Sequence, residues 1–438
     1  MKRLQKPSGT RDILPEEQKY WNFLNYTITK RALAFGFEKI DTPIFESKNV
    51  FSRAVGETTD IVEKEMYELK RSGDANLEKI NPNQEENKES FVLRPEGTAG
   101  VVRSYMENGM QTWPQPVKLF YIGPMFRYDR PQKGRFRQFT QAGIEIIGDD
   151  SPLTDSISIL LLWQIISDLG LKEDTIMEIN SIGCKSCRNK FRKKLLEYYK
   201  PYLSMLCADC SRRFLSNPLR LLDCKEENCQ KIAAGAPQII DSLCVDCKNH
   251  FMKVLEYLDD LDITYDLNPR LVRGLDYYSR TTFEVHDKND TKRQSSLGGG
   301  GRYDNLVELM GGKMTPAIGW ALGYERIIEK IKEKNIEVEE PAGAELFIIQ
   351  IGEKARKMAL PLVAGLNKKG YNASCVLGKE SLKSQLRAAS KMKAKFALII
   401  GQREALDGTM IIRNMEEAAQ ETIAQDKLEK YLEKRFRK

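Results

Sequence analysis

The chain has 438 residues, 41% of them hydrophobic, which suffices for about three domains with sizeable cores. Its net charge of +7 is mildly basic and permits a nucleic-acid partner without demonstrating one. Only two residues are His, which argues against a His-rich metal site, and no long apolar run predicts a membrane span. The N-terminus lacks an apolar signal region, so we expect a cytoplasmic protein.

The N-terminal part of the chain predicts a helix, two strands and a second helix. The first helix begins at Pro15-Glu16-Glu17 and continues to about Phe35. EKEMYEL and SFVLRP are expected as strands on either side of the polar segment Lys70–Glu89, which we interpret as a mobile loop. The segment RPEGT then ends the second strand and begins a helix that reaches Asn108.

Two strands joined by a basic loop are predicted next, over Lys118–Tyr128 and Phe136–Ile147. Side chains two residues apart share one face of a strand. One face of the second strand carries Arg137, Phe139, Gln141, Gly143 and Glu145, and the other carries Thr140, Ala142, Ile144 and Ile146. The second face is apolar, so we expect it to pack against helices.

The mixed face of this hairpin is interpreted as the floor of a ligand site. A hairpin with one face in water also alternates, but such a face seldom combines an aromatic ring with glycines. Arg127 and Arg137 suit phosphates, and Phe139 suits a stacked base. Glu145 suits a cationic ligand group. We therefore favour a binding floor over a solvated face.

After Gly148 the chain predicts a helix over Leu153–Leu169, then a helical, Lys-rich segment that contains eight of the nine cysteines. A strand is expected over Leu271–Val285, where Arg273, Gly274 and the two tyrosines suit an anionic or aromatic ligand as well as an ordinary edge strand. The run Gly298–Gly301 matches neither a P-loop nor a dinucleotide motif, so we expect a turn at a strand end.

AIGWALGYERI is expected to begin a helix that reaches about Lys334. Gly319 and Gly323 would then lie one turn apart, with Arg326 on the same face. Each glycine inside a helix costs about 1 kcal/mol relative to Ala, so either tight packing on a sheet or a close ligand would account for them. Beyond a charged linker, strands and helices alternate from Leu346 onward, which predicts a small independent α/β domain.

Eight cysteines occur as four pairs. Three are Cys-x-x-Cys pairs and one has a four-residue spacer: Cys184/Cys187, Cys207/Cys210, Cys224/Cys229 and Cys244/Cys247. Four pairs fit two tetrahedral thiolate sites, and we favour structural Zn²⁺ over reduced buried thiols or a redox role. The sequence leaves open which pairs share a metal.

The order of GTRD, LRPEGT, FRYDRPQKGRFRQFTQAGIE, LVRGLDYY, GGGRYD and AIGWALGYER closely resembles histidyl-tRNA synthetase, a class II aminoacyl-tRNA synthetase. The resemblance implies an α+β fold: an antiparallel sheet flanked by helices, a helical Cys-rich insertion domain and a C-terminal α/β anticodon-binding domain. The implied boundaries are 1–169 and 267–334 for the catalytic domain, 170–266 for the insertion, 335–343 for a linker and 344–438 for the anticodon-binding domain. It also implies a homodimer built on the segment Phe37–Phe51.

The implied reaction joins L-histidine to ATP, as its Mg²⁺ complex, and passes the histidyl group to the 3′ end of the cognate tRNA. The attacking carboxylate is already an anion, so the site needs positioning and cations more than a nucleophile. The resemblance assigns Arg127, Arg273 and Arg326 to the phosphates and catalysis, and Asp129 and Phe139, with Arg127 and Arg326, to ATP. It assigns Glu96, Thr98, Gln141, Glu145 and Tyr278 to histidine, and Arg130, Gln132, Lys133 and Arg135 to the tRNA acceptor end.

One departure is Asp129, which stands where the family usually has Glu facing the adenine amino group. Three alternatives remain. A regulatory paralogue of ATP phosphoribosyltransferase shares this catalytic fold but typically lacks catalytic residues and the C-terminal domain. A class II synthetase for proline or threonine should lack LVRGLDYY and Glu145 in this context. A zinc-bearing RNA-binding protein without activity would leave the binding floor unexplained.

Overall fold

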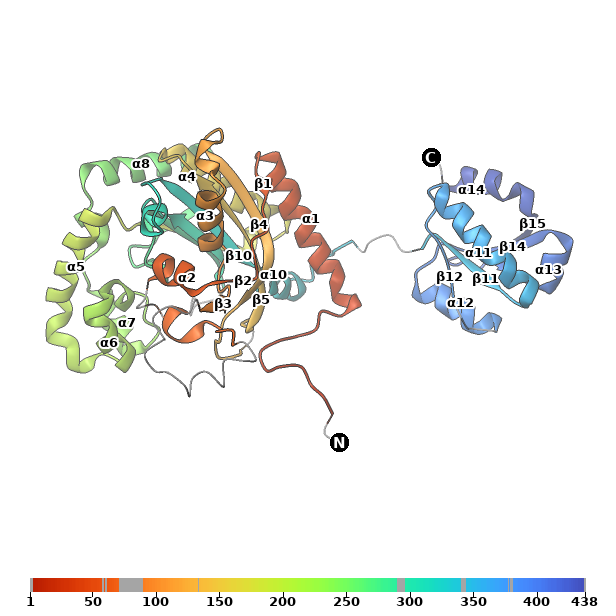
Figure 1. Cartoon of the computed structure of the whole chain (residues 1–438), viewed down its shortest axis with the longest axis horizontal. Coiled ribbons are helices and arrows are strands. Elements are labelled where there is room, and N and C mark those ends of the chain that lie inside the picture. The colour runs from red at the N-terminus through yellow and green to blue at the C-terminus, as the bar shows by residue number, and fades with distance from the viewer. Residues whose placement is uncertain are drawn as a thin grey trace, which may run out of the picture. The chain divides into compact units, whose positions relative to one another are not determined.

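The computed structural model describes residues 3–56, 59, 61–70, 90–132, 134–289, 296–339, 344–376, 378 and 381–436. The chain divides into two compact units, Met1–Val338 and Glu339–Lys438, and the second is blue in Figure 1. Within the described residues, no helix has the length and apolar character that crossing a membrane requires. The expected loop Lys70–Glu89 lies outside the described residues except for Lys70, as does part of the expected linker 335–343.

An eight-stranded sheet forms the centre of the first unit, with the order β1-β4-β5-β10-β9-β8-β6-β7. Its inner neighbours are antiparallel, and only the edge pairs β1–β4 and β6–β7 are parallel. The strands are β1 (Glu38–Lys39), β4 (Val117–Phe126), β5 (Gln138–Ile147), β6 (Thr175–Ser181), β7 (Tyr265–Leu267), β8 (Ser279–Asp287), β9 (Ser296–Arg302) and β10 (Ala317–Gly323). The predicted antiparallel sheet is confirmed.

Helices cover one face of this sheet. They are α1 (Gln18–Ala34), α4 (Pro152–Asp168), α8 (Val245–Asp260) and α10 (Tyr324–Glu333). Ile144 and Ile146 of β5 are buried in one core with residues of these helices, among them Ile28 and Ile159. The prediction that the apolar face of the hairpin packs against helices is therefore confirmed.

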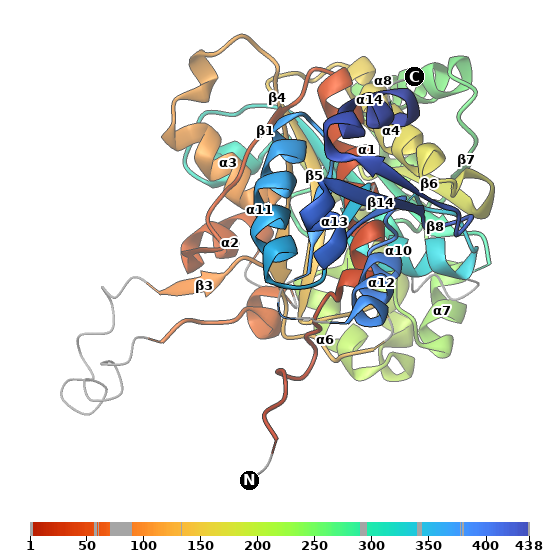
Figure 2. The ribbon, with the colours of Figure 1, turned by 90° about the vertical axis from the view of Figure 1, so that its right-hand side faces the viewer.

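The opposite face of the sheet supports the second core and the site. Two helices, α2 (Lys48–Val55) and α3 (Thr98–Glu107), pack against each other there, as Figures 1 and 2 show. A short helix, α9 (Leu306–Leu309), contacts both. A two-stranded sheet of β2 (Phe45–Ser47) and β3 (Phe91–Leu93) leads into α3. Tyr121, Tyr277 and Tyr278 belong to this core.

The Cys-rich segment forms α5 (Lys185–Tyr199), α6 (Ala208–Ser216) and α7 (Glu227–Ala234), joined by short helical turns. The expected limits 170 and 266 also enclose β6, α8 and β7. Those three elements belong to the large sheet or to the core beneath it. The part that lies outside the sheet layers is therefore narrower, about 182–244. Short turns elsewhere are Pro15–Glu17, Ile61–Glu65, Met110–Thr112, Lys172–Asp174, Lys200–Met205, Pro218–Leu221, Ile239–Ser242 and Gln425–Lys427.

The second unit is built on a five-stranded sheet with the order β12-β11-β13-β14-β15. Its strands are β11 (Leu346–Gln350), β12 (Ala373–Cys375), β13 (Phe396–Ile400), β14 (Thr409–Asn414) and β15 (Gln420–Ala424), and its helices are α11 (Glu353–Lys368), α12 (Leu382–Lys391), α13 (Gln402–Asp407) and α14 (Leu428–Phe436). The predicted alternation is confirmed, although β15 and α13 were not predicted. The lone Cys375 lies half-buried at the edge of a core.

Four local predictions were wrong. AIGWALG is the strand β10, and the helix begins only at Tyr324. The run Gly298–Gly301 lies inside β9, between β8 and β10, where a side chain on Gly299 would meet the carbonyl of Phe283 at 2.6 Å. LVRGLDYY is an irregular loop, because β8 begins only at Ser279. EKEMYEL forms a helical turn and a single bridge from Glu68 to Val92.

Candidate active site

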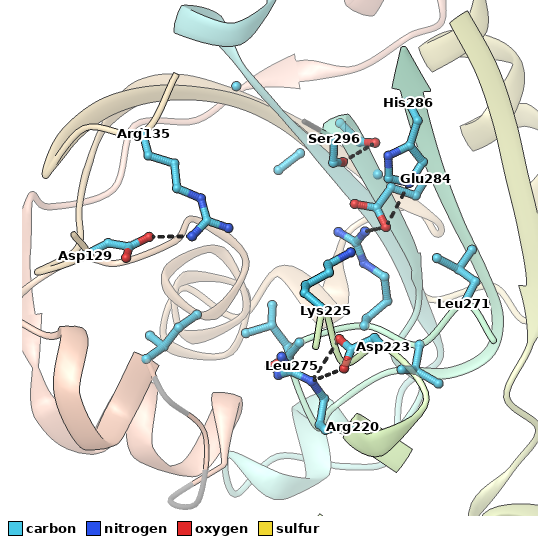
Figure 3. Close-up of a pocket in the computed structure, with 18 of the residues that line it drawn as sticks. Asp129, Arg135, Arg220, Asp223, Lys225, Leu271, Leu275, Glu284, His286 and Ser296 are labelled. Carbon is cyan, nitrogen blue, oxygen red and sulfur yellow. Dashed lines mark hydrogen bonds and ion pairs between the residues drawn. The ribbon is translucent and has the colours of Figure 1, made fainter. Parts of the chain in front are cut away.

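A cavity of about 1030 Å³ opens over β5, β8, β9 and β10. Figure 3 shows that it is enclosed from three sides, by the β4–β5 loop with Asp129 and Arg135, by β8 and β9 with Glu284 and Ser296, and by the Cys-rich segment with Arg220. The predicted site residues that line it are Glu96, Thr98, Arg127, Asp129, Gln132, Arg135, Phe139, Gln141, Arg273, Tyr278 and Arg326. Glu145 and Arg130 do not line it, and Lys133 lies outside the described residues.

The three arginines reach the cavity from different elements. Arg127, just after β4, donates from Nε to the carbonyl of Pro95 at 2.8 Å and lies 5.4 Å from the centre of the Phe139 ring. Arg326, in the first turn of α10, donates to the carbonyl of Ser296 at 2.6 Å. Burial, and then the neighbouring Arg135, lower the pKa of Arg326. The site therefore brings three guanidinium groups from separate elements to one cavity, whose lining also includes carboxylates.

Arg273 is the most firmly paired of the three. Its Nη1 lies 3.1 Å from Oε2 of Glu284 on β8, and its guanidinium lies 5.7 Å from the centre of the Tyr278 ring. Burial alone would lower the pKa of Arg273, but Glu284 and the two tyrosines raise it above its usual value. Burial alone would raise the pKa of Glu284, but Arg273 and His286 hold it well below its usual range. Both groups are therefore charged, and the arginine is fixed in place.

Glu145 of β5 is fully buried and does not line the cavity itself, but it binds Thr98, which does. Its carboxylate accepts hydrogen bonds from the hydroxyls of Thr98, at 2.8 Å, and Tyr303. Burial raises the pKa of Glu145 to about 8, although the two hydroxyls oppose the shift and the nearby Glu96 adds to it. Near neutral pH this carboxyl can therefore give up or take a proton.

Glu96 caps the N-terminus of α3, accepting from the backbone N–H groups of Thr98 and Ala99 at 2.8 Å each. Burial raises its pKa, and the backbone donors and Arg127 oppose that rise. On β5, Oε1 of Gln141 is buried and has no hydrogen-bond partner among the described residues. A buried amide oxygen without a partner is costly, so it is a ready acceptor for a ligand N–H.

The β4–β5 loop is held by its own side chains. Asp129 accepts from the backbone N–H of Arg130 at 2.7 Å and from Nη1 of Arg135 at 3.0 Å. Figure 3 shows this pair facing the open centre of the cavity. In this state the shorter Asp129 carboxylate is engaged within the loop and holds Arg135 at the rim.

The eight cysteines come together as two groups of four, Cys184/Cys187/Cys244/Cys247 and Cys207/Cys210/Cys224/Cys229. Within each group the ligand atoms lie within 4.8 Å of one another. Sulfur atoms are 3.6 Å apart in Cys184/Cys187 and 3.8 Å apart in Cys207/Cys224, far beyond a disulfide bond of about 2.05 Å. Four sulfurs around a tetrahedral metal at about 2.3 Å would lie about 3.8 Å apart, so both groups can hold a metal ion.

Comparison with known proteins agrees with this site. Residues 78–336 match the family described as "tRNA synthetase class II core domain (G, H, P, S and T)", and residues 345–435 match "Anticodon binding domain". A histidine–tRNA ligase of Desulfitobacterium hafniense is 44% identical over 434 residues, which are 99% of each chain. The chain belongs to the histidine–tRNA ligase family. The resemblance, the class II fold and the enzyme class, an ATP-dependent aminoacyl-tRNA ligase, are thereby confirmed.

Two further members of the family are also similar along nearly their whole length. A histidine–tRNA ligase of Acetivibrio thermocellus is 45% identical over 424 residues, which are 97% of this chain and 98% of the relative. The solved structure of the apo histidyl-tRNA synthetase of S. aureus superposes with a TM-score of 0.79 at 35% identity, covering 98% of this chain and 99% of that one. The two-domain architecture of this family is therefore present in full.

Sequence reasoning missed three residues of the site. Tyr303 was quoted within GGGRYD, but nothing along the chain joins it to Glu145, 158 positions away. Glu284 lies within the expected strand Leu271–Val285, where nothing indicates that it pairs with Arg273. Tyr121 has no predicted role, and its ring fills the space left open by Gly97 and Gly143. In the sequence, the only sign of the packed Tyr121 ring is the pair of glycines, Gly97 and Gly143.

Proposed function

We propose that the chain activates L-histidine with ATP, releasing pyrophosphate and forming histidyl-adenylate, and then transfers the histidyl group to the 3′ end of its cognate tRNA. The observation that carries the proposal is the buried carboxyl of Glu145, which accepts from Tyr303 and from Thr98, a residue that lines the same cavity as the three arginines. A carboxyl with a pKa of about 8 can share a proton with an imidazole, which titrates near neutrality.

In this proposal Glu145 and Tyr278 each bind one imidazole nitrogen. A site whose buried polar groups need both nitrogens rejects apolar analogues, because those groups would lose their partners. Glu96, Thr98 and Gln141 hold the α-amino group, for which the buried Oε1 of Gln141 supplies an acceptor. The histidine carboxylate is thereby directed toward the α-phosphate.

Activation needs cations at the phosphates and correct alignment. The histidine carboxylate attacks the α-phosphorus, a P–O bond forms, and the bond to the pyrophosphate oxygen breaks. Arg127 and Arg273 stabilise the charge on the α-phosphate, and Arg326 binds the γ-phosphate. Phe139 stacks on adenine, and Asp129 approaches the adenine amino group once it leaves Arg135. ATP enters as its Mg²⁺ complex.

Arg130, Gln132, Lys133 and Arg135, which lie in sequence between β4 and β5, are assigned to the acceptor end of the tRNA, whose phosphates attract cations. The second unit, similar to known anticodon-binding domains, is assigned to the anticodon. We place the protein in the cytoplasm and propose a homodimer formed through Phe37–Phe51, where Ile44 and Phe45 are 46% and 55% exposed. Light scattering during gel filtration tests the dimer, which I44D should dissociate and L33D, an exposed position on α1, should not.

We propose Zn²⁺ as the metal of both four-cysteine groups, because four thiolates at tetrahedral spacing suit this ion. Backbone N–H groups of Cys244 and Cys207 donate to the sulfurs of Cys187 and Cys229, at 3.1 and 3.3 Å. Such donors stabilise thiolates. Both groups lie outside the phosphate and histidine sites, so the metal would be structural.

Aminoacylation of bulk tRNA with labelled histidine tests the whole reaction. Incorporation that requires ATP, and that proline and threonine do not replace, is the expected result. Absence of incorporation in folded, Mg²⁺-supplied protein would favour the regulatory paralogue. That alternative is disfavoured by the presence of all three arginines and of the C-terminal unit.

A further inference from the structure

The Cys-rich segment holds the loop that carries Arg273. This loop, residues 271–278, has no regular secondary structure. Arg220 donates from Nη1 to the carbonyl of Gly274 at 3.2 Å, and Arg188 donates to the carbonyl of Asp276 at 3.2 Å. Asn217 donates from its amide to the carboxylate of Asp276 at 2.6 Å. Three side chains from one segment thus bind the loop on both sides of Leu275.

Each of these donors either directly follows a cysteine of a four-cysteine group or lies between two cysteines of one group. Arg188 directly follows Cys187 in α5. Asn217 and Arg220 lie between Cys210 and Cys224, at the short turn Pro218–Leu221. Arg220 is itself oriented by Asp223, whose carboxylate accepts from its Nε at 3.1 Å, and Asp223 directly precedes Cys224. Figure 3 shows the Arg220–Asp223 pair at the wall of the cavity.

We propose that the two four-cysteine groups, when they bind metal, act as braces that fix the loop 271–278 and so position Arg273 and Tyr278. The group that contains Cys207 and Cys224 is close enough to line the cavity itself. The other group begins where the chain leaves β6, and there Arg280, just beyond the loop, donates from its backbone N–H to the carbonyl of Gly183 at 2.9 Å. The braces therefore act on the middle of the irregular segment and just beyond its C-terminal end.

The size of the segment explains why metal would be needed. The part outside the sheet layers, about 182–244, is short, and its buried side chains, including Phe191, Leu195 and Ile232, share one core with residues of α2 and α3 and do not form a core of their own. Segments of this size seldom bury enough apolar surface to hold a fixed shape and commonly use a metal instead. Without the metal, Arg188, Asn217 and Arg220 would lose their fixed positions while the large sheet remained folded.

The inference about Arg273 rests on the proposed function, but the brace can be measured without activity. Native mass spectrometry of the full chain should find two Zn²⁺ per chain, with one lost from C187S/C247S and one from C210S/C229S. Hydrogen exchange of peptides covering 271–278 should be faster in either variant than in the wild type, while peptides from α4 keep their rates. Folded protein that carries no metal, or metal loss that leaves loop exchange unchanged, would overturn the proposal.

A second set of variants leaves every cysteine in place, in case the cysteine variants do not fold. R220A and N217A should keep both metals yet accelerate exchange in the loop. K231A, a cation on α7 paired with Glu227, is the matched control and should change nothing. If the proposed function holds, R220A should lower kcat for histidine-dependent pyrophosphate exchange by about tenfold to a hundredfold, the cost of a misplaced catalytic group.

The KM for ATP should change much less in R220A, because Arg220 touches the loop and not the proposed phosphate site. A change confined to KM, with wild-type kcat and loop exchange, would refute a positioning role. Wild-type protein without any histidine-dependent exchange would refute the proposed function alone, since the metal content and the hydrogen exchange of the loop would still report on the brace.

Discussion

At the scale of single residues, Glu145 shows how burial prepares a recognition group. Its neighbours Thr98 and Tyr303 donate hydroxyl hydrogen bonds, yet burial still raises its pKa to about 8. An acid whose pKa is raised on folding holds its proton in the folded state and has lost it in the unfolded state. Its contribution to stability is therefore complete below its unfolded pKa and is lost as the pH rises toward 8.

The E145Q variant should lack this pH dependence of stability. The two hydroxyls bind different oxygens of Glu145, so Gln keeps an acceptor for one of them and offers an amide N–H to the other, and it does not titrate. Between pH 6 and pH 8, the free energy of unfolding of the wild type should fall relative to E145Q, by at most about 1.4 kcal/mol per pH unit. Urea unfolding at the two pH values, monitored by tryptophan fluorescence, measures this difference in the free energy of unfolding. Parallel pH dependences of the two proteins would contradict the raised pKa.

Arg273 and Glu284 form a buried pair, 3.1 Å apart, and their variants separate folding from chemistry. R273A should reduce histidine activation by about a hundredfold or more, the effect of losing one fixed transition-state donor. It should also lower stability, because it leaves Glu284 buried without its cation. Single-turnover adenylate formation and thermal unfolding measure the two effects.

The double variant R273A/E284Q is the control. It removes the unpaired charge, so it should recover much of the lost thermal stability while remaining inactive. Near-normal activation in either variant would contradict the assigned role of Arg273. Recovery of activity together with stability would mean that Arg273 serves folding alone.

Much of the site could be predicted at this scale, because side chains alternate between the two faces of a strand. This alternation places Phe139 and Gln141 on the same face. Predicting the hairpin required only the spacing of residues that are close together in the sequence. The partners Tyr303 and Glu284 could not be predicted in the same way, since their contacts depend on strand order across the sheet. The pairing of the cysteines was open for the same reason.

At the scale of elements, the strand β10 explains the largest error of the sequence prediction. Gly319 and Gly323, four residues apart, suggested one face of a helix, but both lie in a strand, where Gly319 permits a close approach. Gly319 lies opposite Glu145 in the register of β10 and β5, and a side chain there would overlap the Glu145 carboxylate. The helical pattern belongs only to the residues from Tyr324 onward.

G319A and its matched control G323A test this explanation. Both glycines lie in β10, but a Cβ at Gly323 has no described neighbour within 4 Å. G319A should weaken histidine binding by at least about tenfold, since it displaces the carboxyl that we assign to the imidazole. G323A should bind histidine as the wild type does. Isothermal titration calorimetry without ATP makes the comparison, and equal affinities for both variants would refute the explanation.

At the scale of the whole molecule, the two units have separate cores and separate sheets. The alternation of strands and helices after residue 344 was sufficient to predict the second unit, because each of its elements is local in sequence. The catalytic unit was harder to delimit. Its sheet takes β6 and β7 from either side of the Cys-rich segment, and β7 has only three residues, so composition alone extended the insertion too far.

The separation of the units leads to a prediction about the two half-reactions. Every residue that lines the cavity belongs to the first unit. A chain ending at Val338 should therefore keep histidine-dependent pyrophosphate exchange within about threefold of the full chain, yet lose most tRNA charging because anticodon contacts are absent. Parallel assays of exchange and aminoacylation on the two proteins test it. Full charging by the shortened chain would contradict the role given to the second unit.

Histidine-dependent ATP–pyrophosphate exchange by the full chain, run beside proline and threonine, tests the central claim most directly. The account predicts exchange with histidine alone, dependent on Mg²⁺ and lost in E145Q and R273A. Exchange with proline or threonine, or no exchange with any of the three in folded protein, would contradict it.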